Sequence, residues 1–109
     1  MYMMSPEYPR NIHVYAIKAP DGSVHKVGKS SVGTRVSDGA SIRAESQVRE
    51  LNRIDIEDGG YGGYSSEIRK RFGSSGEALD YEARWRDTYR RLYGEDKLPG
   101  NREHLRGRR

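Results

Sequence analysis

Residues 12–30 constrain the fold more than any other stretch, because they predict a β-hairpin. The segment from Ile12 to Lys18 is rich in β-branched and aromatic residues in strict alternation. This alternation divides the side chains between two faces, with Ile12, Val14 and Ala16 on one and His13, Tyr15 and Ile17 on the other. A Pro-Asp-Gly turn follows at residues 20–22, in which proline presets φ and glycine takes the left-handed position. We therefore expect a return strand from Ser23 to Gly28.

The clearest helix lies near the C-terminus. Ser74 and Glu77 form a capping box, and Gly94 supplies a stop signal. The apolar stripe between them comprises Leu79, Trp85, Tyr89 and Leu92. Glu82 falls within this stripe. A lone buried carboxylate costs several kcal/mol unless it is paired, protonated or bound to a cation, so Glu82 needs a compensating partner.

The middle of the chain predicts shorter elements. Apolar residues at helical spacing predict a helix over 41–52, and alternation over 53–57 suggests a short third strand. Four glycines in residues 58–64 predict a loop. A further short helix is expected over 66–72, with Ile68 and Phe72 one turn apart. The sum is an α+β fold in which a small antiparallel sheet, founded on the hairpin, is flanked by about three helices.

Length and charge limit the classes of function. A chain of 109 residues, 33% apolar and 33% charged, forms one small domain with a modest core. We expect an N-terminal arm over 1–11, the domain over 12–101 and a basic tail over 102–109. The net charge of +4 favours an anionic partner, although solvated surface charge alone would also explain it.

The sequence has no cysteine, which excludes disulfides and cysteine-ligated zinc. It also has no apolar run of the roughly 20 residues that a membrane span needs, so we expect no membrane partner. The N-terminus lacks the pattern of a secretory signal.

With these residues in view, the chain resembles the GIY-YIG nuclease superfamily. His13-Val14-Tyr15 stands where the first signature triplet would be, and Lys26-Val27-Gly28 stands where the second would be. The match continues through Gly28-Lys29-Ser30, Arg35, Glu82 and Asn101, in family order, from about Ile12 to Asn101. His13 replaces the usual glycine and Lys26 the usual tyrosine. Asp38 to Glu45, with Leu98-Pro99-Gly100-Asn101, also resembles the C-terminal nuclease modules of bacterial polymorphic toxins.

The resemblance implies a metal-dependent endonuclease. Glu82 would hold one divalent ion, Mg²⁺ or Mn²⁺. Tyr15 would act as general base or orient the attacking water; the first role requires nearby cations to lower its phenol pKa, and Lys26 is a candidate for that task. Arg35 would clamp the scissile phosphate. Residues expected around these groups or on the substrate are Asn101, His13, His25, Lys29 and Arg43.

Each assignment has a structural alternative. Tyr15 also suits strand packing, Lys26 a solvated strand position, and Arg35 a pair with Asp38. Glu82 also suits an i+4 ion pair with Arg86. His13 and His25 suit structural roles, Asn101 a turn, and Arg43 a solvated helix face.

Three functions follow. The first is an endonuclease on nucleic acid, with DNA favoured over RNA, as an antibacterial toxin module. Such a module would act in the cytoplasm of a target cell, arrive through a secretion system within a larger toxin, and have an immunity protein as partner. The second is an inactive GIY-YIG-like domain that binds nucleic acid without cleaving it, because Lys26 replaces a tyrosine. The third is a structural interaction protein, which would show no salt-dependent affinity for DNA.

Overall fold

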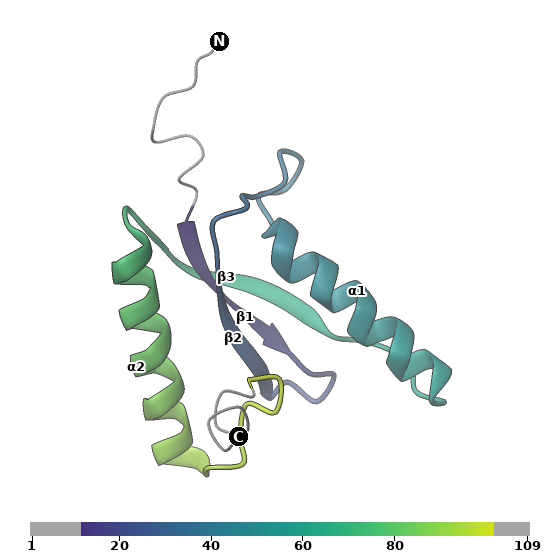
Figure 1. Ribbon diagram of the computed structural model, residues 1–109. Coiled ribbons are helices and arrows are strands. Elements are labelled where there is room, and N and C mark those ends of the chain that lie inside the picture. Colours follow the sequence, from purple (N-terminus) through teal and green to yellow (C-terminus); the bar gives the residue numbers. More distant parts are fainter. Residues whose placement is uncertain (1–11, 102–109) are drawn as a thin grey trace, which may run out of the picture.

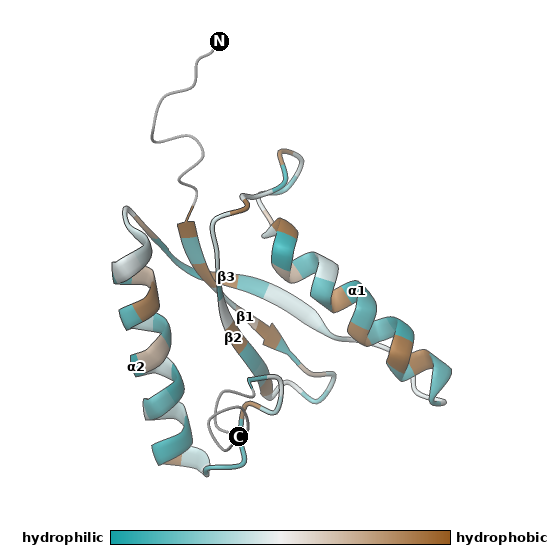
Figure 2. Ribbon diagram, in the orientation of Figure 1, coloured by the Kyte–Doolittle hydropathy of each residue, from teal (hydrophilic) through white to brown (hydrophobic). Residues whose placement is uncertain are grey.

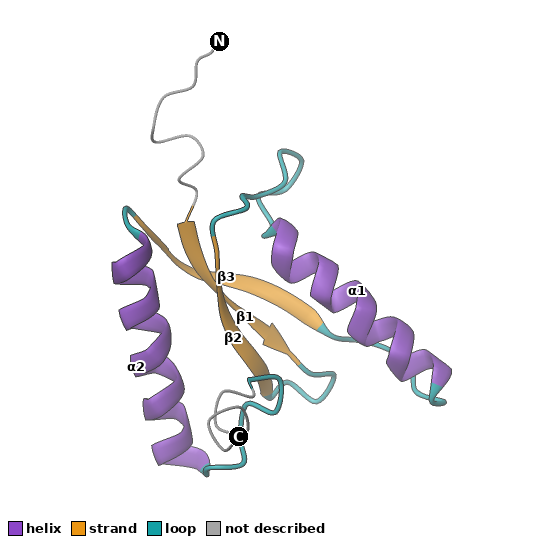
Figure 3. Cartoon of the chain, in the orientation of Figure 1, coloured by secondary structure: helices purple, strands orange, loops and turns teal. Residues whose placement is uncertain are grey.

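The computed structural model describes residues 12–101, so the expected arm over 1–11 and basic tail over 102–109 lie outside the described residues. In chain order the elements are β1 (Ile12–Lys18), β2 (Val24–Ser30), α1 (Ile42–Glu57), β3 (Ser65–Phe72) and α2 (Ser75–Tyr93). The predicted α+β class with a small antiparallel sheet is confirmed (Figure 3). Residues 12–101 contain two helices rather than about three.

The hairpin forms as the sequence predicts, and it sets the register of the candidate site. β1 and β2 pair antiparallel, with Tyr15 directly opposite Gly28. The turn is closed by the Gly22 amide, which donates to the Ala19 carbonyl at 2.9 Å, and Gly22 has a φ of +90°. Glycine adopts this conformation without steric cost.

Residues 66–72 form a strand, so the helix predicted there is wrong. β3 pairs antiparallel with the other side of β1, which makes β1 the centre of a sheet with the order β2-β1-β3. Buried β1 needs a hydrogen-bonding neighbour on both sides, because its main-chain groups have no access to water. This requirement outweighs the helical spacing of Ile68 and Phe72.

The first helix is longer than predicted, and the strand expected over 53–57 is wrong. α1 begins after Ser41, whose hydroxyl accepts from the Ala44 amide, and it continues to Glu57. Arg53 forms ion pairs with Glu50 and Glu57 at helical spacing. The alternation over these residues therefore reflects a solvated last turn and not a strand.

The two faces of the sheet are covered by different helices, which lie on either side of it in Figure 1. Ile12 and Val14 pack with Val27 and Ala78 on the α2 side. Tyr15 and Ile17 pack with α1 on the other. The predicted division of β1 into two faces is confirmed, and side chains on both faces of this strand are buried, although brown and teal segments alternate along it in Figure 2.

The ends of α2 match the prediction, but its buried stripe does not. The Ser74 hydroxyl accepts from the Glu77 amide at 3.2 Å, and Gly94 ends the helix. Leu79 and Leu92 are 51% and 67% exposed, so their predicted place in the stripe is wrong. The residues that pack toward the sheet are Ala78, Tyr81, Trp85 and Tyr89. The small Ala78 side chain lets α2 approach the sheet. With Ala78, Tyr81, Trp85 and Tyr89 turned toward the sheet, Glu82 lies at the border of the packed face of the helix.

The segment after α2 returns to the outer edge of β2. The side-chain amide of Asn101 pairs with both main-chain groups of Val27, donating to the carbonyl and accepting from the amide, each at 2.8 Å. The Gly100 amide donates to the His25 carbonyl at 2.8 Å. Arg90 donates to the carbonyl groups of Lys97 and Asn101. These bonds hold the C-terminal segment beside β2.

Over residues 12–101, neither helix has the length and hydropathy required to cross a bilayer.

Candidate active site

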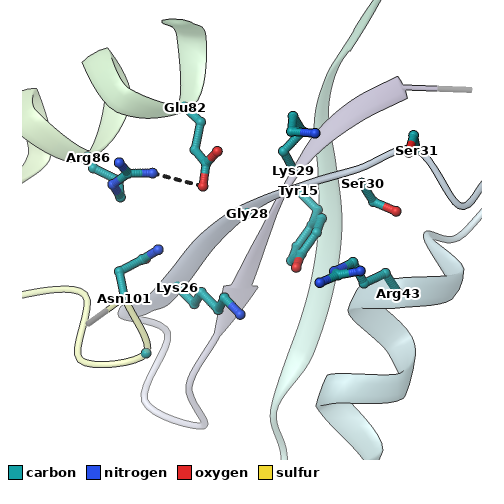
Figure 4. A pocket seen from close by; sticks show the side chains of 11 residues that line it. Tyr15, Lys26, Gly28, Lys29, Ser30, Ser31, Arg43, Glu82, Arg86 and Asn101 are labelled. Atoms are coloured by element: carbon teal, nitrogen blue, oxygen red, sulfur yellow. Dashed lines mark ion pairs between the residues drawn. The ribbon is translucent and has the colours of Figure 1, made fainter. Parts of the chain in front are cut away.

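A polar cleft of about 420 Å³ lies where β2, the start of α1, the middle of α2 and the C-terminal segment meet (Figure 4). Within residues 12–101, one carboxylate lines it, that of Glu82, together with the phenol of Tyr15. The cations that line it are Lys26, Lys29, Arg43 and Arg86. The remaining lining residues are Gly28, Ser30, Ser31, Gly100 and Asn101. Residues far apart in the sequence thus surround one space in which positive charge predominates.

Tyr15 occupies its place because Gly28 has no side chain. A Cβ atom at Gly28 would lie 2.5 Å from the Tyr15 hydroxyl oxygen and 2.6 Å from Cζ. The ring therefore passes directly over this strand position, and Tyr15 is only 1% exposed. The pairing of Tyr15 with Gly28 across the hairpin brings the phenol to the cleft.

The phenol is neutral at neutral pH. Burial raises the pKa of Tyr15 above its ordinary value, and the nearby charge of Glu82 adds to this effect. Hydrogen bonds from Gln47 and Arg43, together with the positive charge of Arg43, act in the opposite direction but do not prevail. A general base at this position would need a lowered pKa, so this arrangement does not favour that role for Tyr15. A neutral phenol suits the other predicted role, which is to orient a water molecule.

Arg43 and Lys26 approach Tyr15 from two elements. Arg43 lies in the first turn of α1, and its guanidinium and the phenol point toward one another in Figure 4. Lys26 extends from β2, and its ammonium donates to Oε1 of Gln47 at 3.1 Å. Gln47, which the sequence analysis did not single out, thus contacts both Lys26 and Tyr15. Its position one helical turn after Arg43 is the sequence signal that would have indicated it.

Glu82 faces the cleft from α2 and is paired there. Its carboxylate lies 2.8 Å from Nη1 of Arg86, and the side chains of Glu82 and Arg86 are 12% and 21% exposed. This is the i+4 ion pair that the sequence offered as the structural alternative to metal binding. Arg86 lines the cleft as well, so the pair belongs to the site.

The described lining of the cleft offers a metal ion one carboxylate, that of Glu82. Residues 12–101 contain no group of three or more histidine, cysteine, aspartate or glutamate side chains arranged to hold a metal. Mg²⁺ is commonly bound through one or two carboxylates while it keeps several waters and contacts substrate phosphate. A single carboxylate in an open polar cleft is compatible with this mode, provided that Arg86 releases Glu82.

Arg35 does not reach the cleft. Its guanidinium donates to both carboxylate oxygens of Asp38, at 2.6 and 3.1 Å, and lies 3.8 Å from Glu45. The hydrogen bond to Asp38 raises the pKa of Arg35 further. The structure therefore shows the alternative that the sequence left open, and Arg43 is the guanidinium that it brings to Tyr15.

The remaining predicted residues divide between cleft and scaffold. Lys29 lines the cleft and donates to the Ser75 hydroxyl at 3.1 Å. Asn101 also lines it, although its amide is used on β2. His13 is fully buried, and its Nε2 lies 2.7 Å from the hydroxyl of Ser41, the N-cap of α1. His25 lines a neighbouring depression rather than the cleft.

Comparisons with protein-family models, with curated proteins and with solved structures produced no match to this chain.

Proposed function

We propose that this protein is a metal-dependent endonuclease of the GIY-YIG type, which hydrolyses phosphodiester bonds in DNA. The observation that carries the proposal is the cleft in which Tyr15, Lys26 and Arg43 lie around the same space as Glu82. Phosphodiester hydrolysis requires an oriented water and neutralisation of charge on the phosphate. The side chains of this cleft supply groups for both requirements.

The charges of the cleft fit an anionic substrate. In the part of the chain that the structure describes, four cationic side chains line it against a single carboxylate, so a backbone phosphate would find a net positive environment. Arg43 presents a planar guanidinium that can bind two non-bridging oxygens at once. Lys26 adds a point charge that Gln47 holds in place.

The proposed roles follow from burial and charge. Glu82 would hold one Mg²⁺ or Mn²⁺, which supplies charge neutralisation on the phosphate and a more acidic water when bound. The neutral phenol of Tyr15 orients the attacking water by hydrogen bonding. Arg43 and Lys26 stabilise the negative charge that grows on the phosphate oxygens in the transition state. Asn101 is a positioning residue, since it fixes β2 next to the cleft.

The biological role that we propose is a toxin module, as its resemblance to polymorphic-toxin nucleases implies. Such a module would act on DNA in the cytoplasm of a target cell after delivery as part of a larger protein. An immunity protein would be its natural partner. Growth arrest on induction of the wild type, but not of Glu82→Gln, is the expected outcome in cells.

Cleavage of supercoiled plasmid tests the activity directly. The protein is incubated with plasmid and Mg²⁺ or Mn²⁺, with and without EDTA, alongside Glu82→Gln and Asp80→Asn. Asp80 is an exposed carboxylate on the same helix that does not line the cleft, so it controls for loss of one negative charge. We expect EDTA and Glu82→Gln each to lower the rate by about 100-fold or more, and Asp80→Asn to leave it unchanged.

Two outcomes would contradict the proposal in different ways. Cleavage that survives both EDTA and Glu82→Gln would refute the metal assignment. Intact plasmid with every metal, together with salt-dependent DNA binding, would refute the enzyme and favour the binding domain that the lysine at position 26 suggests.

A further inference from the structure

A second depression of about 480 Å³ adjoins the cleft. Lys26 and Gly100 line both, so the two spaces meet along the edge of β2. The side chains of Leu51 and Pro99 contribute apolar surface to the second depression. Glu50, Gln47, His25 and Lys26 contribute polar groups. Apolar walls with a few polar groups are typical of a small-ligand site, whereas the neighbouring cleft is polar and cationic.

The position of the His25 ring is set from two sides. It packs edge to face against Tyr64, with ring centroids 5.5 Å apart. On the other side, a Cβ atom at Gly100 would lie 2.7 Å from both Cδ2 and Nε2 of His25. Only glycine at position 100 lets the main chain of the C-terminal segment pass this close to the ring. The imidazole is therefore a preformed wall of the depression.

We propose that this depression binds one nucleobase of the substrate, next to the phosphate held in the cleft. The inference rests on the proposed function, because it assigns the phosphate to the adjoining cleft. A nucleotide consists of a planar, largely apolar base joined through a sugar to an anionic phosphate. The depression would receive the base, and the adjoining cationic cleft would receive the phosphate. The Lys26 ammonium lies at their common boundary, where it meets the anionic end of the nucleotide.

Mononucleotides separate base binding from phosphate binding. The isotope-labelled full chain is titrated in EDTA with dAMP and with 2-deoxyribose 5-phosphate, and the amide shifts are followed by NMR. We expect the sugar phosphate to shift amides of the cleft, such as those of Lys29 and Arg43. The nucleotide should also shift amides of His25, Leu51 and Gly100, and bind at least about fivefold more tightly, as burial of part of the base against the apolar surface of Leu51 and Pro99 predicts.

A variant whose new side chain fills the depression tests the base site, with a matched control elsewhere on the surface. Pro99 is exposed at the rim, so Pro99→Trp places an indole over the depression without disturbing the core. Leu92→Trp adds the same side chain at a 67% exposed position of α2 that lines neither space. Pro99→Trp should make the two ligands bind equally, and Leu92→Trp should preserve the preference for dAMP.

The two proposals fail separately. Equal affinities of the two ligands for the wild type, or base-dependent shifts remote from Leu51, would overturn the nucleobase site while leaving plasmid cleavage untouched. A preference for dAMP that Pro99→Trp does not reduce would overturn it as well. Absence of plasmid cleavage together with a dAMP preference lost in Pro99→Trp would refute the endonuclease and support the base site.

Discussion

Replacing Gly28 with alanine should displace the Tyr15 ring and destabilise the fold. The added methyl group would lie 2.5 Å from the hydroxyl oxygen, 2.6 Å from Cζ and 3.0 Å from Cε1 of Tyr15. The ring has little room to retreat, because Tyr15 is 1% exposed and packs with Ile17, Ala44 and Val48. One of these neighbours, or the strand itself, must shift.

The expected cost is that of overpacking a well-filled core, about 1–3 kcal/mol in the free energy of unfolding. For a domain of this size, each kcal/mol lowers Tm by about 4–8 °C. Without the clash, the same substitution should be neutral or stabilise by up to about 1 kcal/mol, because glycine loses more backbone entropy on folding than alanine. The sign of the effect thus depends on the side chain at position 15.

A double-mutant cycle with Tyr15→Leu measures this dependence. Gly28→Ala should destabilise the wild type but not the Tyr15→Leu variant, which gives a coupling of at least about 1 kcal/mol. Gly76→Ala is the control, because an added Cβ there meets no atom within 4 Å. Urea unfolding followed by the fluorescence of Trp85 and by circular dichroism supplies the free energies.

An equal effect of Gly28→Ala in both backgrounds would refute the reasoning, since the ring would then not be what the methyl group meets. A stabilising Gly28→Ala in the wild type would refute it more directly. Loss of plasmid cleavage in Gly28→Ala is expected as well, because the displaced phenol no longer reaches the cleft.

Three further predictions concern charged and titratable groups in and near the site. Arg43→Ala should slow plasmid cleavage by about 100-fold, whereas Arg35→Ala should have little effect; the reverse order would restore Arg35 as the phosphate clamp. Arg86→Gln should tighten Mn²⁺ binding, measured by electron paramagnetic resonance, because Arg86 competes with the ion for Glu82; weaker binding would mean that Arg86 instead orients the carboxylate. Because the pKa of Tyr15 is raised, the folded state favours the neutral phenol. The contribution of this phenol to the free energy of unfolding is therefore complete below its unfolded pKa of about 10, and it is lost as the pH rises through the folded pKa. Urea titrations from pH 8 to 11 should show this loss in the wild type and not in Tyr15→Phe.

Local patterns predicted the parts of the fold that depend on neighbours in sequence. The hairpin turn, the two faces of β1 and the caps of α2 each follow from residues a few positions apart. The same patterns failed over 53–57 and 66–72, where short segments are compatible with either helix or strand. Over 66–72, the need of β1 for a second hydrogen-bonding neighbour decided the outcome, whereas 53–57 continues α1 with ion pairs at helical spacing.

The candidate site divides in the same way. Tyr15, Lys26 and Glu82 were predicted from motif positions, and the structure brings all three to one cleft. The choice between Arg35 and Arg43 could not be made from the sequence, because it depends on where α1 lies against the sheet.

The sequence by itself determined which residues alternate across β1, where the hairpin turns and where α2 begins and ends, because these features arise from steric and hydrogen-bonding preferences over a few residues. Tertiary structure alone decided that β3 completes the sheet, that the amide of Asn101 pairs with Val27, and that Tyr15, Lys26 and Glu82 line one cleft. These contacts join segments distant in the chain, and their free energy depends on the simultaneous packing of both helices against the sheet.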